Sequence, residues 1–157
     1  MTALVEQNVR LIADSLTLIE NLDGSGYAIA GPHFRHCIDF YECFLRGLES
    51  GHIDYDERDR STEVEQSPAA AAAALEGIRE RLEVISDSVL TTPVEMRADV
   101  VDPGVDWSRS TVGRELVFLV SHTVHHHALI ALLLRQKNIE VPADFGMAPS
   151  TLEHQRR

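Results

Sequence analysis

Apolar residues recur every three or four positions along four stretches of the chain, and this spacing predicts four amphipathic helices. The helices are expected to cover residues 2–22, 32–50, 68–90 and 111–137. Pro32 and Pro68 stand where a proline is tolerated in the first turn of a helix, because the missing N–H has no partner there. The pattern therefore predicts an all-α protein.

The segments that join these helices differ in character. Residues 51–67 are too polar to form a core element and are expected to make a charged excursion over the surface. Val94 to Val101 favours one or two short strands, which are followed by a turn at Asp102, Pro103 and Gly104. We therefore expect a long crossover between the second and third helices and short strands between the third and fourth.

The chain of 157 residues has the usual length of one domain. Residues 138–157 are rich in turn formers but include Val141, Phe145 and Met147, so this tail is expected to pack on the helices. The prediction is a single domain over residues 1–157, folded as an antiparallel four-helix bundle with one long crossover.

The net charge of −11 argues against nucleic acids and anionic membranes as partners, because both recruit lysine and arginine. Cys37 and Cys43 lie six apart on one predicted helix and point to different faces, so no mutual disulfide is expected. No export signal is visible at the N-terminus. These features together predict a cytoplasmic protein.

Residues 116–134, LVFLVSHTVHHHALIALLL, are long enough to raise the question of a membrane span. Four histidines interrupt this stretch, and ionisable groups at bilayer depth are costly and rare. The stretch is therefore interpreted as a central helix buried on most sides, and no membrane partner is expected.

His122 and His126 lie four residues apart and present two imidazoles to the same point on the last helix. This H-x-x-x-H spacing can chelate one metal ion. The shared stripe also carries Leu119 and Leu129, so it is interpreted as an inward face, with Glu115 one heptad before His122. Buried imidazoles there need hydrogen-bond or metal partners.

A second source of histidine lies at the predicted start of helix two, where His33 and His36 are three apart. His36, followed by Asp39 and Phe40 on the next turn, is expected to face the interior. Together with His122 and His126 it would give three neutral nitrogen ligands and leave a position open for water or substrate, as in catalytic sites. Asp39 and Glu115 are candidates for supporting the ligands, or for plain surface and helix-start carboxylates.

The remaining histidines fit simpler roles. His125 and His127 are interpreted as core or interface residues that face neighbouring surfaces, and His52 and His154 as solvated. Cys37, between aromatic positions on an apolar stripe, is expected to be plain core rather than a reactive thiol. A serine hydrolase is not indicated, because Ser121 lacks the turn that presents such a nucleophile.

Three segments of this sequence resemble the DinB superfamily of metal-binding four-helix bundles. They are GPHFRHCIDFYECFLRGLESGHIDYDERDR, the histidine-rich last helix and the tail from Pro142 to Thr151. The resemblance implies an up-down-down-up bundle with a divalent metal, often nickel or zinc. The implied ligands are one histidine of helix two, His36 or alternatively His33, and the pair His122 and His126.

The resemblance also implies an activity for some members, as thiol-dependent S-transferases and isomerases that use low-molecular-weight thiols. We therefore expect a divalent-metal protein, with nickel or zinc ahead of iron or manganese, acting on a small-molecule substrate. The alternative is a non-catalytic metal- or ligand-binding module of a stress-response system, since no catalytic base is evident. Apolar residues all round the last helix, including Phe118 and Leu132, predict a homodimer.

Overall fold

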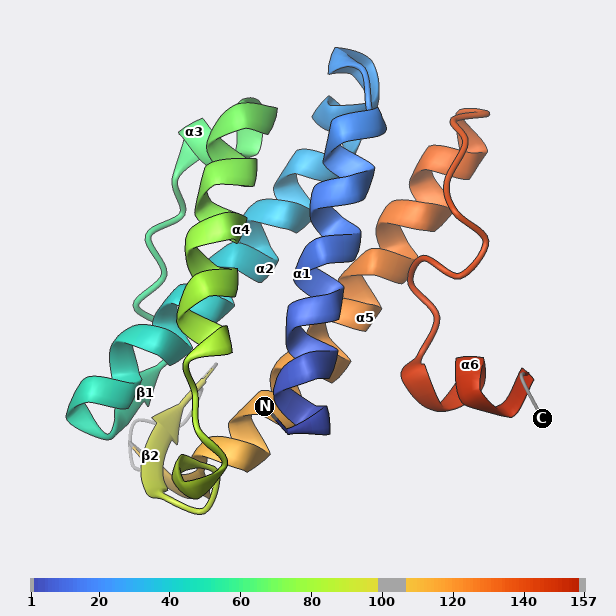
Figure 1. The fold of residues 1–157 in the computed structure, drawn as a ribbon. Coiled ribbons are helices and arrows are strands. Elements are labelled where there is room, and N and C mark those ends of the chain that lie inside the picture. Colours follow the sequence, from blue (N-terminus) through green and yellow to red (C-terminus); the bar gives the residue numbers. More distant parts are fainter. Residues whose placement is uncertain (1, 99–106, 156–157) are drawn as a thin grey trace.

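The computed structural model describes residues 2–98 and 107–155, and this part of the chain is mostly helical with a small three-stranded sheet. Four long helices make up most of it: α1 (Ala3–Asn21), α2 (Gly24–Ser50), α4 (Pro68–Glu83) and α5 (Val112–Gln136). Figure 1 shows them packed side by side, with α1 and α2 each in contact with both α4 and α5. The all-α class expected from the periodicity is therefore correct, apart from the sheet.

Helix α2 begins eight residues earlier than predicted, at Gly24 rather than at Pro32. The Asp23 side chain caps it by accepting a hydrogen bond of 2.7 Å from the backbone N–H of Gly26. Pro32 therefore lies inside the helix, where it removes one backbone hydrogen bond. The sequence-based start was wrong because Pro32 was taken as a first-turn residue, whereas the cap at Asp23 is the stronger start signal.

Helix α4 ends at Glu83, seven residues before its predicted end. Ser67 caps its start by accepting a hydrogen bond from the N–H of Ala70, and Leu82 is its last fully buried apolar residue. Val84 is 81 % exposed, and the chain then turns through the short 3-10 helix η1 (Asp87–Val89). The apolar spacing continues past Glu83 in the sequence because Ile85 is buried and Val89 packs against the core, although neither residue belongs to α4.

The crossover between α2 and α4 contains more structure than the predicted excursion. It includes strand β1 (His52–Asp54) and helix α3 (Thr62–Gln66). Ile53 and Tyr55 are buried, so the expectation that this polar segment forms no core element was wrong. At Gly47, an added Cβ would lie 2.6 Å from the carbonyl oxygen of His52, so glycine permits the close approach of α2 to the strand.

The sheet joins the two long connections of the fold. Strand β1 pairs in parallel with β2 (Pro93–Arg97), and β2 pairs antiparallel with β3 (Ser108–Thr111). One strand predicted within Val94 to Val101 is therefore present as β2, whereas β3 follows the predicted turn and was not expected. The predicted turn at Asp102 to Gly104 lies outside the described residues. Thr111 ends β3 and caps α5 by accepting a hydrogen bond from the N–H of Arg114.

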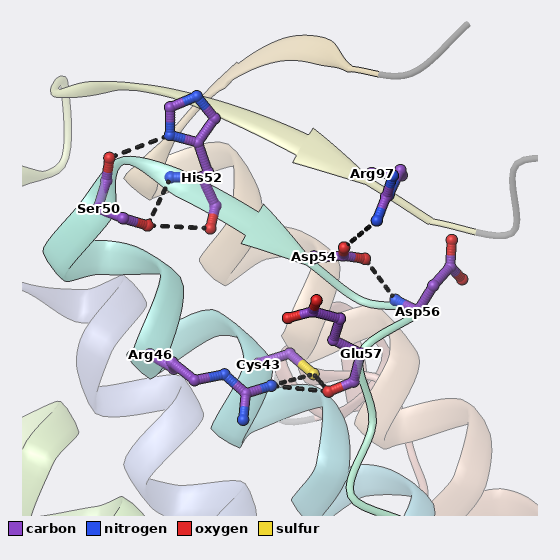
Figure 2. A network of polar contacts seen from close by, with 8 residues as sticks. All are labelled: Cys43, Arg46, Ser50, His52, Asp54, Asp56, Glu57 and Arg97. Carbon is purple, nitrogen blue, oxygen red and sulfur yellow. Dashed lines mark hydrogen bonds and ion pairs between the residues drawn. The ribbon is translucent and has the colours of Figure 1, made fainter.

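Polar contacts fix the segment that follows β1 to the neighbouring elements (Figure 2). The Asp54 carboxylate accepts a hydrogen bond of 3.0 Å from the N–H of Asp56 and pairs with Arg97 of β2. Arg46 of α2 donates to the carbonyl oxygen of Glu57 at 2.7 Å. The backbone just before Arg58 is thus held against α2.

After α5 the chain folds back along it and ends in helix α6 (Pro149–Gln155), as Figure 1 shows. Val141 and Phe145 are buried, and the ring of Phe145 stacks on His127 at 4.3 Å between ring centres. The described part of the tail, residues 138–155, therefore contributes apolar side chains to the core.

A buried polar network links three of the long helices. Tyr41 of α2 donates to the side-chain oxygen of Asn8 on α1 at 2.8 Å, and Thr123 of α5 donates to the Tyr41 hydroxyl at 3.4 Å. The Asn8 amide nitrogen donates to the carbonyl oxygens of Leu4 and Leu116. Because these groups are paired, their burial is tolerated.

Among the described residues, α5 is the one helix whose length and composition would let it cross a membrane. A third of its most apolar window is buried inside the structure. Core helices of soluble proteins satisfy the same test, so a single helix of this kind is weak evidence for a membrane span.

Candidate metal centre

The histidines of α5 divide between two faces of the helix. The buried face carries Leu116, Leu119, Thr123 and His127, and it packs into the core. His122 and His126 lie beside this face and are half-buried. The stripe that contains them was predicted to point inward, but it flanks the core, and the two rings therefore remain within reach of solvent.

His36 of α2 meets this pair, so three imidazoles come together from two helices. One ring nitrogen of each of the three histidines, His36, His122 and His126, lies within 4.8 Å of the corresponding nitrogens of the others. The ring centres are 4.9 Å apart for His36 and His122, 4.5 Å for His36 and His126, and 4.8 Å for His122 and His126. This three-histidine group could hold a metal ion.

The donor set suits a divalent ion. Zinc binds imidazole nitrogen at about 2.0–2.1 Å, which places two tetrahedral ligands roughly 3.3 Å apart, so modest ring movements would close the group around one ion. Burial, with the neighbouring His36 and His122, lowers the pKa of His126 to about 3. That ring is therefore neutral at pH 7, as a nitrogen ligand must be.

His33, the alternative ligand of helix two, lies behind His126. The Nδ1 atoms of His33 and His126 are 3.0 Å apart, so one donates a hydrogen bond to the other. This contact leaves Nε2 of His126 as the nitrogen available to an ion, an arrangement typical of residues that orient a metal ligand. Burial and the nearby His125 lower the pKa of His33. The structure thus favours His36 for the group and gives His33 a supporting position.

The two candidate carboxylates are both buried. Asp39 is 6 % exposed and accepts a hydrogen bond from the backbone N–H of Arg60, and burial raises its pKa. Glu115 is fully buried, and its carboxylate accepts hydrogen bonds from Tyr55 (2.9 Å), Ser110 (2.5 Å) and Arg114 (3.2 Å). These partners lie in the crossover, in β3 and next to Glu115 on α5, and none of them is a histidine. Of the two alternatives for Glu115, the contacts among the described residues therefore favour a helix-start carboxylate over one that orients a metal ligand.

Aromatic rings form one wall of the centre. Phe40 of α2 stacks on His122 at 4.2 Å between ring centres and lies 4.8 Å from His36. Phe118 of α5 lies 5.5 Å from His122, and Tyr55 stacks on Phe40 at 5.1 Å. An apolar wall excludes water from one side of the three imidazoles, which strengthens polar interactions there.

Arg58 of the crossover also reaches the centre, because its Nη1 lies 3.3 Å from Nδ1 of His36. Its guanidinium carbon lies 5.5 Å from the ring centre of Phe40. The sequence did not identify Arg58 or Tyr55 as site residues, because both lie in the segment that was interpreted as a surface excursion. The alternation of Ile53 and Tyr55 with Asp54 was the available signal for a half-buried strand there.

The other histidines are not part of the three-histidine group, although the ring of His125 lies edge-on to His126 at 5.2 Å between ring centres. His127 is 1 % exposed, contacts Ser15 at 2.8 Å, and burial lowers its pKa to about 3. His125 is exposed, as expected for a residue that faces a neighbouring surface. His52 is exposed but pairs with Glu95 at 3.2 Å.

Cys37 is buried in the core, and burial raises the pKa of its thiol to about 12. The thiolate is therefore not populated at neutral pH, and a reactive role for this cysteine is not supported.

Comparison with known proteins identifies a family that matches this part of the chain. A family model described as the DinB superfamily matches residues 30–130, more than half of the chain and the part that contains all three histidines. The chain is also similar to a protein of Rhizopus delemar named FK506-binding protein 5, with 36 % identity over 104 residues. That match covers 65 % of this chain but 27 % of the relative, so the similarity spans about a quarter of the longer protein. No solved structure matches the chain.

Proposed function

We propose that this chain, which belongs to the DinB superfamily, binds one divalent metal ion through His36, His122 and His126. The observation that carries the proposal is the approach of three ring nitrogens to within 4.8 Å of one another from two separate helices. Three imidazoles suit nickel or zinc, and also iron. Manganese, which prefers oxygen ligands, is the remaining alternative. The up-down-down-up order of the four long helices, which the resemblance implies, is part of the same proposal.

Metal analysis of untagged protein tests the site, because a polyhistidine tag would bring its own ion. We expect near-stoichiometric metal in the wild-type protein and its loss in His126→Ala. His125→Ala is the matched control, since His125 is exposed on the adjacent position of the same helix. Wild-type protein that resists reconstitution with zinc, nickel, iron and manganese would rule out the site.

The same measurement distinguishes the two histidines of α2. His36→Ala is expected to abolish metal binding, whereas His33→Ala should weaken it by about 10- to 100-fold, the range typical of residues that orient a ligand. The reverse order of effects would assign the third ligand to His33.

We further propose that this protein is a thiol-dependent S-transferase or a related metal-dependent enzyme, and that it acts on a small molecule at this centre. A bound divalent ion favours deprotonation of a thiol or water that it coordinates, and so supplies a nucleophile at neutral pH. The chain itself contributes three imidazole ligands and the apolar wall formed by Phe40 and Phe118, which limits the access of water.

Substrate-dependent consumption of a low-molecular-weight thiol, lost in His122→Ala and kept in His125→Ala, is the expected result. Thiol or metal binding without consumption, across a panel of electrophilic substrates, would favour the alternative of a non-catalytic binding module in a stress response.

A cytoplasmic homodimer completes the proposal. Val117 and Leu132 of α5 are 52 % and 54 % exposed, and apolar groups on the surface of a central helix suit contact with a second copy. Light scattering should give twice the chain mass of 17.5 kDa, and Leu132→Glu should restore the single-chain mass. The single-chain mass at all working concentrations would refute the dimer.

A further inference from the structure

Arg58 occupies a position that bears directly on the proposed third ligand. Its Nη1 lies 3.3 Å from Nδ1 of His36. A guanidinium group carries donors only, so Arg58 donates this hydrogen bond and Nδ1 of His36 accepts it. A neutral His36 that accepts at Nδ1 must carry its proton on Nε2.

This hydrogen bond and a metal ion exclude each other, whichever nitrogen of His36 would bind the ion. If Nδ1 is the ligand, Arg58 already uses the lone pair that the ion needs. If Nε2 is the ligand, that atom must lose its proton, and in neutral His36 the proton then lies on Nδ1. Nδ1 is then a hydrogen-bond donor, and Arg58, which has donors only, cannot accept from it. Repulsion between the guanidinium and the ion acts in the same direction.

We propose that Arg58 competes with the metal ion for His36, and that the released guanidinium then binds a negatively charged group of the substrate beside the metal. This inference rests on the proposed metal site and adds to it a substrate class, thiols that carry a carboxylate. Arg58 thereby serves as a switch between the metal-free and metal-loaded forms and as a specificity residue in the loaded form.

Several contacts keep the released guanidinium close to the centre. The preceding residue, Glu57, is fixed through its carbonyl oxygen by Arg46 of α2 at 2.7 Å (Figure 2). The Arg58 side chain also lies over Phe40, which itself stacks on His122. Nε of Arg58 is buried and has no hydrogen-bond partner among the described residues, so an incoming carboxylate would satisfy a donor that is now unpaired.

A second guanidinium stands on the same aromatic wall. Arg114 lies over Phe118, with its guanidinium carbon 5.7 Å from the ring centre, and Phe118 is 6.0 Å from Phe40 between ring centres. Arg114 also donates to the Glu115 carboxylate at 3.2 Å, so the positive charge that would attract an anion here is chiefly that of Arg58 and of a bound divalent ion, in contrast to the net charge of −11 of the whole chain. The local charge therefore favours an anionic substrate over a neutral one.

Zinc titration of metal-free protein, with a chromophoric chelator as competitor, tests the competition. Arg58→Gln should bind zinc about ten-fold more tightly than wild type, because a hydrogen bond to the ligand no longer has to be broken. Arg58→Lys, which keeps the charge but not the planar fork, should fall between the two. Arg79→Gln on α4 removes the same charge away from the centre and should match wild type.

Unchanged or weaker zinc binding in Arg58→Gln, together with normal binding by wild type, would refute the competition and leave the metal site standing. Absence of zinc binding in wild type and in both Arg58 variants would refute the metal site and the inference with it. Binding that appears only in Arg58→Gln would be the strongest support for the competition.

The substrate class is tested on cobalt-loaded protein with mercaptoacetate and 2-mercaptoethanol, two thiols that differ by a carboxylate. Changes in the visible cobalt spectrum report binding of each thiol. Wild type should prefer mercaptoacetate, and Arg58→Gln should reduce this preference about ten-fold while Arg79→Gln preserves it. Equal preference in wild type and Arg58→Gln would refute the role of Arg58 in substrate selection.

Discussion

Replacement of His127 by glutamine should make the protein less sensitive to acid. Ser15 donates its hydroxyl to the carbonyl oxygen of Leu11 at 3.1 Å, so it accepts from Nε2–H of His127 at 2.8 Å. Nδ1 of His127 is buried and has no hydrogen-bond partner among the described residues. Protonation of Nδ1 would therefore place an unpaired charge in the core, and burial lowers the pKa of His127 to about 3.

The sign and size of the effect follow from proton linkage. An unfolded histidine has a pKa of about 6.5, so below that pH the unfolded chain binds a proton that folded His127 refuses. The contribution of His127 is complete above pH 6.5 and is lost as the pH falls toward its folded pKa of about 3. The free energy of unfolding should fall by about 1.4 kcal/mol per pH unit, or about 2 kcal/mol between pH 6.5 and 5, from this residue alone.

Urea unfolding of chelator-treated protein at pH 7, 6 and 5 measures this dependence without a contribution from metal release. His127→Gln can still donate to Ser15, so it should lose about 1 kcal/mol at pH 7 through the lost stacking on Phe145 and show the shallower pH dependence. His154→Gln, at an exposed position of α6, should keep the wild-type dependence. Equal slopes in wild type and His127→Gln would refute the argument.

Two further substitutions test the packing around the centre. Tyr55→Phe removes a donor to the fully buried Glu115 and should lower the free energy of unfolding by about 1–3 kcal/mol. The loss should exceed that of Tyr27→Phe, because the Tyr27 hydroxyl donates to the neutral carbonyl of Val64. Equal losses in thermal unfolding would contradict this. Gly47→Ala should lower the free energy of unfolding by about 1–3 kcal/mol, because the added Cβ would lie 2.6 Å from the β1 backbone. Gly77→Ala, where the added Cβ has no atom within 4 Å, should raise the free energy of unfolding by about 0.5–1 kcal/mol.

The sequence predicted those parts of the fold that depend on local spacing. Periodicity identified the four long helices, and H-x-x-x-H placed His122 and His126 together, because residues four apart meet on any helix. The start of α2 and the end of α4 were missed because prolines and apolar spacing were weighted above caps, such as that at Asp23. Local signals therefore located the helices but not all of their ends.

The rest depended on contacts between distant parts of the chain. His33 and His36 differ by one turn, so the choice between them follows from how α2 packs on α5 rather than from their own neighbours. Tyr55 and Arg58 reach the centre only because β1 pairs with β2 and Arg46 holds Glu57. The burial of Glu115 likewise rests on Tyr55, 60 residues away in the chain.

The buried network of Asn8, Tyr41 and Thr123 also sets the axial register between α2 and α5. Tyr41 follows His36 by five residues and Thr123 directly follows His122, so the network and the three imidazoles lie at similar heights along the same pair of helices. Sliding one helix by a single turn would shift its histidines by about 5.4 Å and break the buried hydrogen bonds at the same time. A substitution such as Asn8→Ala, on a helix that supplies no ligand, could thus loosen the metal geometry.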